Sequence, residues 1–351
     1  MENKKIEVNG FAFIEMGIKN DSSACDVLHS LGFECAYTTK NIIFEKQGIA
    51  NILLRTDEHS HANIYSKKHG TSISGIGFYV SSARDSFKTA IENGARVAQI
   101  RNKKVKKAYD YYAIEAIGGS TIYFIDTECK WFNLLSTPSK NGKNAKLEEI
   151  DHITFNVERG SLDKWAQFYI DIFNFDEIKF FNIKGKETGL ISRALANKKR
   201  NVRIPINEST DKNSQIEKFL GDFKGAGAQH VAFSSSDIYK SIDVIRKNKL
   251  SFLKTPDDYY KIIEKKFLLK QERSNKLKKH GILIDMEKND PNQSLLQIFT
   301  EELFGPLFFE IIQRNNNIGF GEGNFQSLFE VIEAHQLNAK GMQNEQKTIN
   351  E

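Results

Sequence analysis

Pro306-Leu307-Phe308-Phe309-Glu310-Ile311-Ile312-Gln313-Arg314 is the stretch on which the fold and the function of this chain depend. Its aromatic and β-branched residues are typical of a buried strand. Because side chains alternate along a strand, Phe308, Glu310 and Ile312 are predicted to share one face. A buried carboxylate without a cation is costly, or loses its charge. Glu310 therefore needs a cationic partner, which is either a lysine or arginine side chain or a metal ion.

The composition is that of a globular protein, with 40% apolar and 27% charged residues among 351, and the length predicts two domains. No apolar run reaches the length of a membrane span and no signal-type segment follows Met1, so we expect a cytoplasmic protein without a membrane partner. The net charge of +5 is mild, which argues against nucleic acid and suits an anionic substrate. The three cysteines lack Cys-x-x-Cys spacing and predict neither disulfides nor a thiolate metal site.

Basic residues concentrate in residues 101–107, 198–200 and 264–279, which we interpret as solvated surface. The last segment alternates charged and apolar residues, and this pattern predicts one solvated amphipathic helix.

A short pattern recurs four times along the chain: a glycine or histidine, an apolar residue, a small residue and a phenylalanine, followed by a helix-like segment. The copies start 65, 77 and 78 residues apart, and they read Gly10-Phe11-Ala12-Phe13, Gly75-Ile76-Gly77-Phe78, His152-Ile153-Thr154-Phe155 and His230-Val231-Ala232-Phe233. Regular recurrence indicates internal duplication. We predict four βαβββ modules in two domains, with a boundary in the polar segment 137–143.

The repeats differ at their first position. The amino-terminal copies carry Gly10 and Gly75, whereas the carboxy-terminal copies carry His152 and His230, so only the second domain has nitrogen donors there. Two histidines and Glu310 form the set of ligands that non-haem Fe(II) enzymes use, which leaves open positions for substrate and O2. Four ligands would have indicated a glyoxalase-like hydrolase or isomerase, but the third module has no donor at the counterpart of Glu310. Zinc, manganese or cobalt would also accept these ligands.

The remaining histidines are interpreted as structural, because scattered histidines are common on protein surfaces. His59 and His61 are assigned to a polar loop, and four others are isolated in the sequence: His29, His69, His280 and His335.

The carboxy-terminal half resembles the 4-hydroxyphenylpyruvate dioxygenase family, which has the vicinal oxygen chelate fold. The resemblance rests on residues 150–153, 225–233, 295–300, 308–314 and 319–325, and it is weaker in the amino-terminal half. It implies an α+β fold in which each domain is an open β-barrel with helices outside. Residues 1–140 would form an amino-terminal domain without a metal site. Residues 149–351 would form the catalytic domain, with an Fe(II) site and a C-terminal lid helix.

The resemblance also implies the roles of individual residues. Fe(2+) would be the cofactor, with His152, His230 and Glu310 as its ligands. The catalytic residues would be Gln229, Gln297, Asn324 and Phe325, and the substrate-binding residues Ser192, Asn207, Gln215, Phe299, Phe308, Phe320 and Phe329. Amide side chains can hold a phenol or a keto acid without adding charge, and phenylalanines provide an apolar slot for an aromatic ring.

The implied reaction converts 4-hydroxyphenylpyruvate and O2 to homogentisate and CO2 in tyrosine and phenylalanine catabolism. It combines oxidative decarboxylation, ring hydroxylation and side-chain migration, and a homodimer or homotetramer is expected. Three alternatives stay open: a hydroxymandelate synthase, an extradiol catechol dioxygenase, and a non-catalytic aromatic-binding protein of the same fold. The bulky Phe325 favours the ring-hydroxylating enzyme over the synthase.

Overall fold

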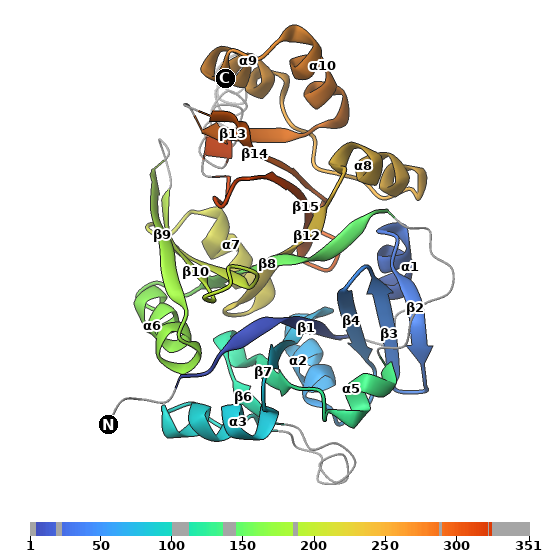
Figure 1. The fold of residues 1–351 in the computed structure, drawn as a ribbon, viewed down its shortest axis with the longest axis vertical. Helices are drawn as coiled ribbons and strands as arrows, with labels where there is room; N and C mark the ends of the chain where they lie inside the picture. The colour runs from blue at the N-terminus through green and yellow to red at the C-terminus, as the bar shows by residue number, and fades with distance from the viewer. Residues whose placement is uncertain are drawn as a thin grey trace, which may run out of the picture.

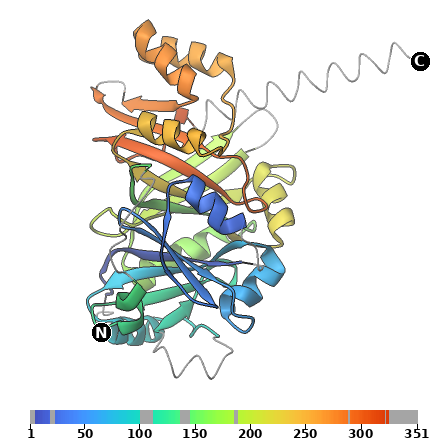
Figure 2. The ribbon, with the colours of Figure 1, turned by 90° about the vertical axis from the view of Figure 1, so that its right-hand side faces the viewer.

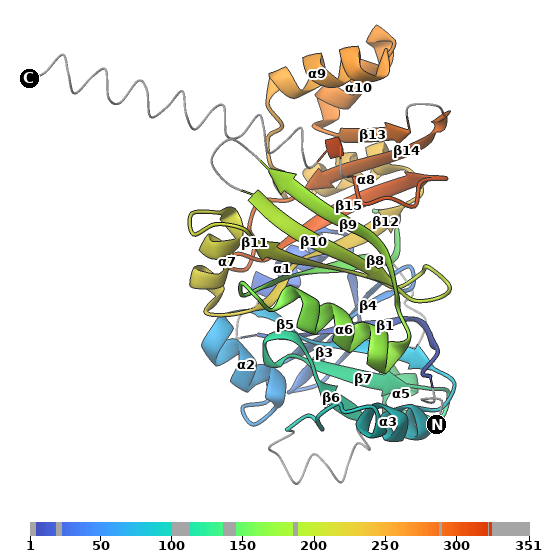
Figure 3. The ribbon, with the colours of Figure 1, turned by 90° about the vertical axis from the view of Figure 1, so that its left-hand side faces the viewer.

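The computed structural model describes residues 5–18, 23–99, 112–135, 145–184, 189–287, 290–321 and 323–324. Within them, two curled sheets lie one above the other, and helices α3, α6, α8, α9 and α10 occupy the periphery (Figure 1). The turned views in Figures 2 and 3 show the same two layers from the sides. None of the described helices has the length and apolar character needed to cross a membrane.

The amino-terminal sheet has the strand order β2-β3-β4-β1-β5-β7-β6. Its elements are β1 (Val8–Gly17), α1 (Ser23–Ser30), β2 (Glu34–Thr38), β3 (Ile42–Gln47), β4 (Ala50–Arg55), α2 (His61–His69), β5 (Ser72–Val80), α3 (Ala83–Glu92), β6 (Ala113–Glu115), the 3-10 helix η1 (Ile117–Gly119), β7 (Thr121–Ile125) and α5 (Lys130–Leu135).

The carboxy-terminal sheet has the order β13-β14-β15-β12-β8-β11-β10-β9. Its elements are β8 (Leu147–Val157), α6 (Leu162–Phe173), β9 (Asp176–Lys184), β10 (Gly189–Ala196), β11 (Arg203–Ser209), α7 (Gln215–Phe223), β12 (Gly227–Ser235), α8 (Ile238–Lys247), α9 (Asp257–Phe267), α10 (Gln271–His280), β13 (Leu283–Glu287), β14 (Asp290–Phe299) and β15 (Phe308–Asn315).

Both sheets are built in the same way from two modules. The opening strands of the modules pair antiparallel at the centre, β1 with β5 and β8 with β12. Each opening strand also pairs in parallel with the closing strand of its own module: β4, β7, β11 or β15. In the second module, the bridge between Val97 and Ile114 stands where the other modules have a further strand. The predicted α+β fold of duplicated modules is confirmed, and the limits of the two domains stay a proposal.

Aromatic rings join the two halves of the chain. The ring of Phe33 lies 5.2 Å from that of Phe233, and the ring of Phe78 lies 5.4 Å from that of Phe173. The loop after β10 reaches across as well, because the amide of Asn197 donates to the Val8 carbonyl. The basic loop at residues 198–200 therefore lies beside a contact between the two halves.

Two local predictions are wrong. Residues 264–279 do not form one helix, because α9 ends where Leu268 adopts a left-handed backbone with φ of 49°, and α10 begins at Gln271. His61 does not lie in a loop, since it opens α2, whose N-cap Ser60 accepts a hydrogen bond from the Asn63 amide. The predicted boundary segment 137–143, the basic segment 101–107 and the lid helix lie outside the described residues.

The sheet register also corrects the alignment of the first repeat. Ala232 pairs with His152, and the corresponding Gly77 pairs with Phe13. The counterpart of His152 is therefore Phe13 and not Gly10, because a repeat is defined by its place in the sheet.

The other two counterparts follow from the same pairing. Gly75 occupies the place of His230, as predicted, and Tyr123 occupies the place of Glu310. The Phe13 ring lies so close to Gly77 that a Cβ there would stand 2.4 Å from it. Aromatic rings therefore occupy the place in the amino-terminal sheet that corresponds to the ligand positions. The Phe13 ring lies 5.6 Å from that of Phe132.

Candidate metal centre and substrate pocket

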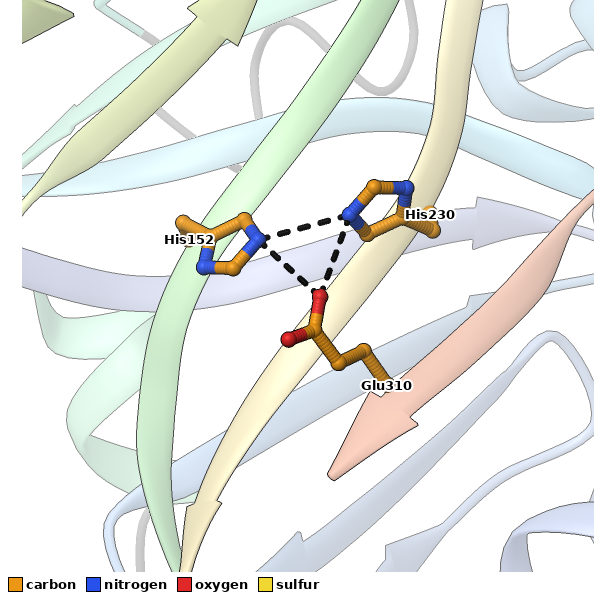
Figure 4. A group of neighbouring side chains, drawn as sticks. All are labelled: His152, His230 and Glu310. Carbon is orange, nitrogen blue, oxygen red and sulfur yellow. Dashed lines mark hydrogen bonds and ion pairs between the residues drawn. The ribbon is translucent and has the colours of Figure 1, made fainter. Parts of the chain in front are cut away.

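Three adjacent strands bring the predicted ligands together. His152 lies on β8, His230 on β12 and Glu310 on β15, and the register pairs Ala232 with both His152 and Glu310. Glu310 Oε2 lies 3.2 Å from His152 Nε2 and 3.3 Å from His230 Nε2. The two Nε2 atoms are 3.3 Å apart (Figure 4). Among the described residues, this is the one group of three such side chains close enough to share a metal ion.

The size of this triangle suits a metal ion. The point equidistant from the three atoms lies about 1.9 Å from each, slightly less than the ~2.0–2.2 Å of metal bonds to nitrogen and oxygen. The spacing of the three atoms thus leaves room for one ion bound by all three. Bonds of ~2.1 Å give ligand separations of roughly 3.0 Å in an octahedral site and 3.4 Å in a tetrahedral one. The observed separations lie between these, so the distances admit either geometry.

Hydrogen bonds at the far side of each imidazole fix which nitrogen faces the triangle. His152 Nδ1 lies 2.8 Å from Asp151 Oδ1, and His230 Nδ1 lies 3.1 Å from Gln229 Oε1. Both oxygens only accept, so each Nδ1 carries the proton and each Nε2 presents a lone pair. With the carboxylate oxygen, three acceptors face one another at 3.2–3.3 Å. A metal cation bound between them would satisfy all three.

A β-bulge precedes each of these histidines. In the pairing of β8 with β12, Asp151 and Gln229 have no register partner. Each is therefore the extra residue of a bulge. Residues next to each other in a regular strand point to opposite faces, whereas a bulge re-aims the extra side chain. The bulges thus allow Asp151 and Gln229 to contact the neighbouring imidazole, and the duplicated modules use the same device twice.

Arg314 holds Asp151 from behind. Its guanidinium donates from Nε to Oδ2 at 2.7 Å and from Nη2 to Oδ1 at 2.8 Å, a two-point contact that adds specificity. Although burial raises the pKa of Asp151, Arg314 and then His152 lower it well below the usual range. The arginine of the opening stretch therefore pairs with Asp151, and the close contacts of Glu310 are with the two histidine imidazoles.

The ionisation of Glu310 suits cation binding. Burial raises its pKa, but the two imidazoles outweigh burial and lower it to about 2. Burial lowers the pKa of His152, but Glu310 and Asp151 outweigh it and raise the net value. Burial dominates at His230 and lowers the pKa of that imidazole. Glu310 is thus a carboxylate at physiological pH, the form that binds a divalent ion.

A cavity of about 550 Å³ opens on the triad. It is mostly apolar, with a few amides, as small-molecule sites are. The predicted pocket residues within the described part of the chain all line it: Ser192, Asn207, Gln215, Gln229, Gln297, Phe299, Phe308, Phe320 and Asn324. Phe325 and Phe329 lie outside the described residues, so their roles stay predictions. Five apolar residues that the sequence analysis did not name also line the cavity: Phe181, Ile183, Leu190, Phe219 and Leu283.

Gln297 is tied on both sides of its amide. Its nitrogen donates to Glu310 Oε1 at 2.8 Å and to the Phe320 carbonyl at 3.2 Å. Its oxygen accepts from the Asn324 amide at 2.8 Å, and Asn324 in turn accepts from the buried Tyr259 hydroxyl at 2.7 Å. Gln297 and Asn324 therefore connect the metal ligand Glu310 to α9, where Tyr259 is a residue that sequence reasoning missed.

The turn that carries Phe320 depends on Gly321. Its φ is +75°, and a Cβ on it would stand 1.9 Å from Gln297 Oε1. We expect Gly321→Ala to displace Gln297 and reduce turnover about tenfold or more, because positioning losses near a reacting centre are large. Gly305→Ala is the matched control, since Gly305 has a φ of +60° with no atom within 4 Å of its Cβ position. Equal stability and equal turnover in the two variants would show that Gln297 tolerates displacement.

The comparisons with known proteins cover both halves of the chain. The family described as "Hydroxyphenylpyruvate dioxygenase, HPPD, N-terminal" matches residues 2–132. The Glyoxalase/Bleomycin resistance protein/Dioxygenase superfamily matches residues 149–261.

Relatives match over nearly the full length. A 4-hydroxyphenylpyruvate dioxygenase of Legionella pneumophila (strain Corby) is 43% identical over 341 residues, covering 95% of this chain and 97% of the relative. A Vibrio vulnificus protein named hemolysin VllY is 39% identical, covering 94% of this chain and 95% of the relative. A solved structure of a 4-hydroxymandelate synthase mutant from Streptomyces coelicolor superposes with a TM-score of 0.77 at 22% identity, covering 94% of this chain and 100% of the other. That likeness shows the fold alone.

Proposed function

This chain belongs to the 4-hydroxyphenylpyruvate dioxygenase family, and on that premise we propose that it converts 4-hydroxyphenylpyruvate and O2 to homogentisate and CO2 with Fe(II) bound by His152, His230 and Glu310. The observation that carries the proposal is the meeting of these three acceptors at the wall of a mostly apolar cavity. Two imidazoles and one carboxylate are the ligands of non-haem Fe(II) oxygenases.

His152, His230 and Glu310 would hold the Fe(II) ion at the wall of the cavity. Bound there, Fe(II) would supply the redox chemistry for the activation of O2 and the oxidative decarboxylation of the 2-oxo acid. The chain's own contribution is to hold both Nε2 atoms unprotonated, through Asp151 and Gln229, and to provide one negative charge from Glu310. The cavity side stays accessible to the substrate.

Phenylalanines hold the ligands and shape the slot for the substrate ring. The Phe308 ring stacks on the His230 imidazole at 4.9 Å, and the Phe320 ring meets His152 edge-on at 5.7 Å. Phe299 lies 6.0 Å from Phe308, nearly perpendicular to it. These rings limit imidazole rotation and exclude water from the reacting atoms, which suppresses side reactions of an oxidant.

Neutral polar groups line the cavity and can bind the ends of the substrate. Ser192 and Asn207 are register partners on β10 and β11, and Gln215 opens α7. The Asn207 amide donates to Asn156 Oδ1 at 3.3 Å, which leaves the Asn207 oxygen as an acceptor for a phenol hydroxyl. We assign Ser192, Asn207 and Gln215 to substrate binding on this basis.

Oxygen uptake with identification of the product tests the proposal. Protein loaded anaerobically with Fe(II) is mixed with 4-hydroxyphenylpyruvate, and we expect equimolar consumption of O2 and release of homogentisate and CO2. Protein loaded with Zn(II) is the control, because zinc accepts the same ligands but has no redox chemistry. Formation of 4-hydroxymandelate would assign the chain to the synthase reaction. Binding of the keto acid without oxygen uptake would indicate a non-catalytic protein.

A further inference from the structure

Helix α7 of the carboxy-terminal half forms one wall of the substrate cavity. Gln215, Lys218 and Phe219 line the cavity from successive turns of this helix. Its last residue, Phe223, is buried and turns away from the cavity towards α2 of the amino-terminal half. Figures 2 and 3 show α2 directly below α7.

A stack of rings runs from α2 to the cavity wall. The Tyr65 and His69 rings are 4.3 Å apart, and His69 lies 4.4 Å from Phe223 with an angle of 23° between the planes. Phe223 in turn stacks on Phe219, at 5.1 Å and 15°. Ring contacts of this kind add to the burial of area, so displacement of one ring disturbs the next.

A hydrogen bond fixes the stack at the end of α7. His69 Nδ1 donates to the Phe223 carbonyl at 2.6 Å, and this carbonyl belongs to the last turn of the helix, whose acceptors lack helical partners. His69 is 7% exposed. Burial lowers the pKa of its imidazole, which favours the neutral ring. In that form the N–H on Nδ1 is the only hydrogen-bond donor of the ring.

The start of α2 holds the segment that follows α7. His61 Nε2 donates to the Gly119 carbonyl of η1 at 2.9 Å. The neighbouring Gly118, with φ of +64°, packs so closely on Ala226 that a Cβ would stand 2.0 Å from the Ala226 carbonyl oxygen. Ala226 lies between α7 and β12, the strand of His230. The two ends of α2 thus contact the end of α7 and, through η1, the connection behind it.

We propose that His69 is a positioning residue for the substrate cavity, through which the amino-terminal half sets the place of α7 and of its cavity-lining side chains. The inference rests on the proposed function, since the ligand of the cavity is 4-hydroxyphenylpyruvate. The metal triad lies on β8, β12 and β15, outside this stack. Loss of His69 should therefore weaken substrate binding and spare metal binding.

The test compares His69→Ala and His69→Phe with Phe132→Leu. Phe132 packs in the amino-terminal half against Phe13, Phe44, Tyr79 and Trp131, and serves as a control for general loss of stability. KM and kcat are measured with 4-hydroxyphenylpyruvate, and metal affinity by anaerobic titration with Co(II). We expect His69→Ala to raise KM about tenfold, with kcat and Co(II) affinity within about twofold of the unmodified chain. His69→Phe keeps a ring but loses the hydrogen-bond donor, so its KM should lie between those of the unmodified chain and His69→Ala.

Two results would overturn the inference. In the first, both His69 variants have the same KM as Phe132→Leu at a similar melting temperature. The ring stack would then contribute only to packing between the two halves and would not position the cavity. In the second, Co(II) affinity falls together with substrate binding. His69 would then support the carboxy-terminal half as a whole and not α7 in particular. If His69→Ala does not fold, His69→Phe carries the test, and its KM must exceed that of the control. Absence of turnover in the unmodified chain would instead overturn the proposed function.

Discussion

Glu310→Ala is expected to abolish metal binding and oxygen consumption. The carboxylate is the one charged ligand of the triad, and without it two neutral imidazoles remain on a buried face. Removing groups that only support metal ligands already costs about 10–100-fold in affinity, so removal of a ligand should cost more than that. Gln297 would also lose one of the two acceptors for its amide nitrogen and keep the Phe320 carbonyl.

The measurement is an anaerobic titration with Co(II), followed by absorption, together with oxygen uptake after Fe(II) loading. Glu301→Ala is the control, because Glu301 is an exposed carboxylate nine positions before Glu310. We expect His152→Ala and His230→Ala to behave like Glu310→Ala. Full turnover in any of the three would refute the shared metal site.

Asp151→Asn is expected to weaken both the metal site and the fold. An asparagine offers one oxygen and one NH2 group where Arg314 meets two carboxylate oxygens, so the partly buried guanidinium loses the charge of its buried partner. Breaking a buried ion pair costs about 3–5 kcal/mol. His152 also loses the charge on its Nδ1–H acceptor, and such changes reduce metal affinity about 10–100-fold.

Chemical denaturation gives the loss of stability, and Co(II) titration gives the loss of affinity. Asp176→Asn is the matched control, since Asp176 is paired with the cations of Lys198 and Arg200 but lies at the surface. Exposed pairs contribute at most ~1 kcal/mol, so this variant should change little. If Asp151→Asn bound Co(II) as tightly as the unmodified chain, Asp151 would have no part in orienting His152.

The residues that bear the chemistry could be predicted from the sequence because residue type determines what a side chain can ligate. His152 and His230 stood out as donors at matching places in repeated strand patterns, and Glu310 stood out as a carboxylate within a buried strand. The repeat spacing predicted the four duplicated βαβββ modules. The amides and phenylalanines of the pocket came from the family resemblance. Those that lie in the described residues all face one cavity.

The supporting residues could not be predicted in this way. Alternation along a strand places Asp151 on the face opposite His152 and Gln229 opposite His230, and only the bulges in the β8–β12 pairing reverse this. Gln297 was assigned a catalytic role from the resemblance, whereas its hydrogen bonds to Glu310 and the Phe320 turn depend on how β14 meets β15 and the following turn.

The sequence by itself determined which side chains could bind a metal and that the chain repeats one module four times. Only the tertiary structure decided that Phe13, and not Gly10, stands in the place of His152 in the amino-terminal half, and that Asp151 and Gln229 turn towards the ligands. The physical reason is that the direction of a side chain in a sheet depends on which residues of two distant strands share hydrogen bonds. One extra residue in that pairing moves a side chain to the other face of the sheet, and residue type alone does not reveal where such a bulge occurs.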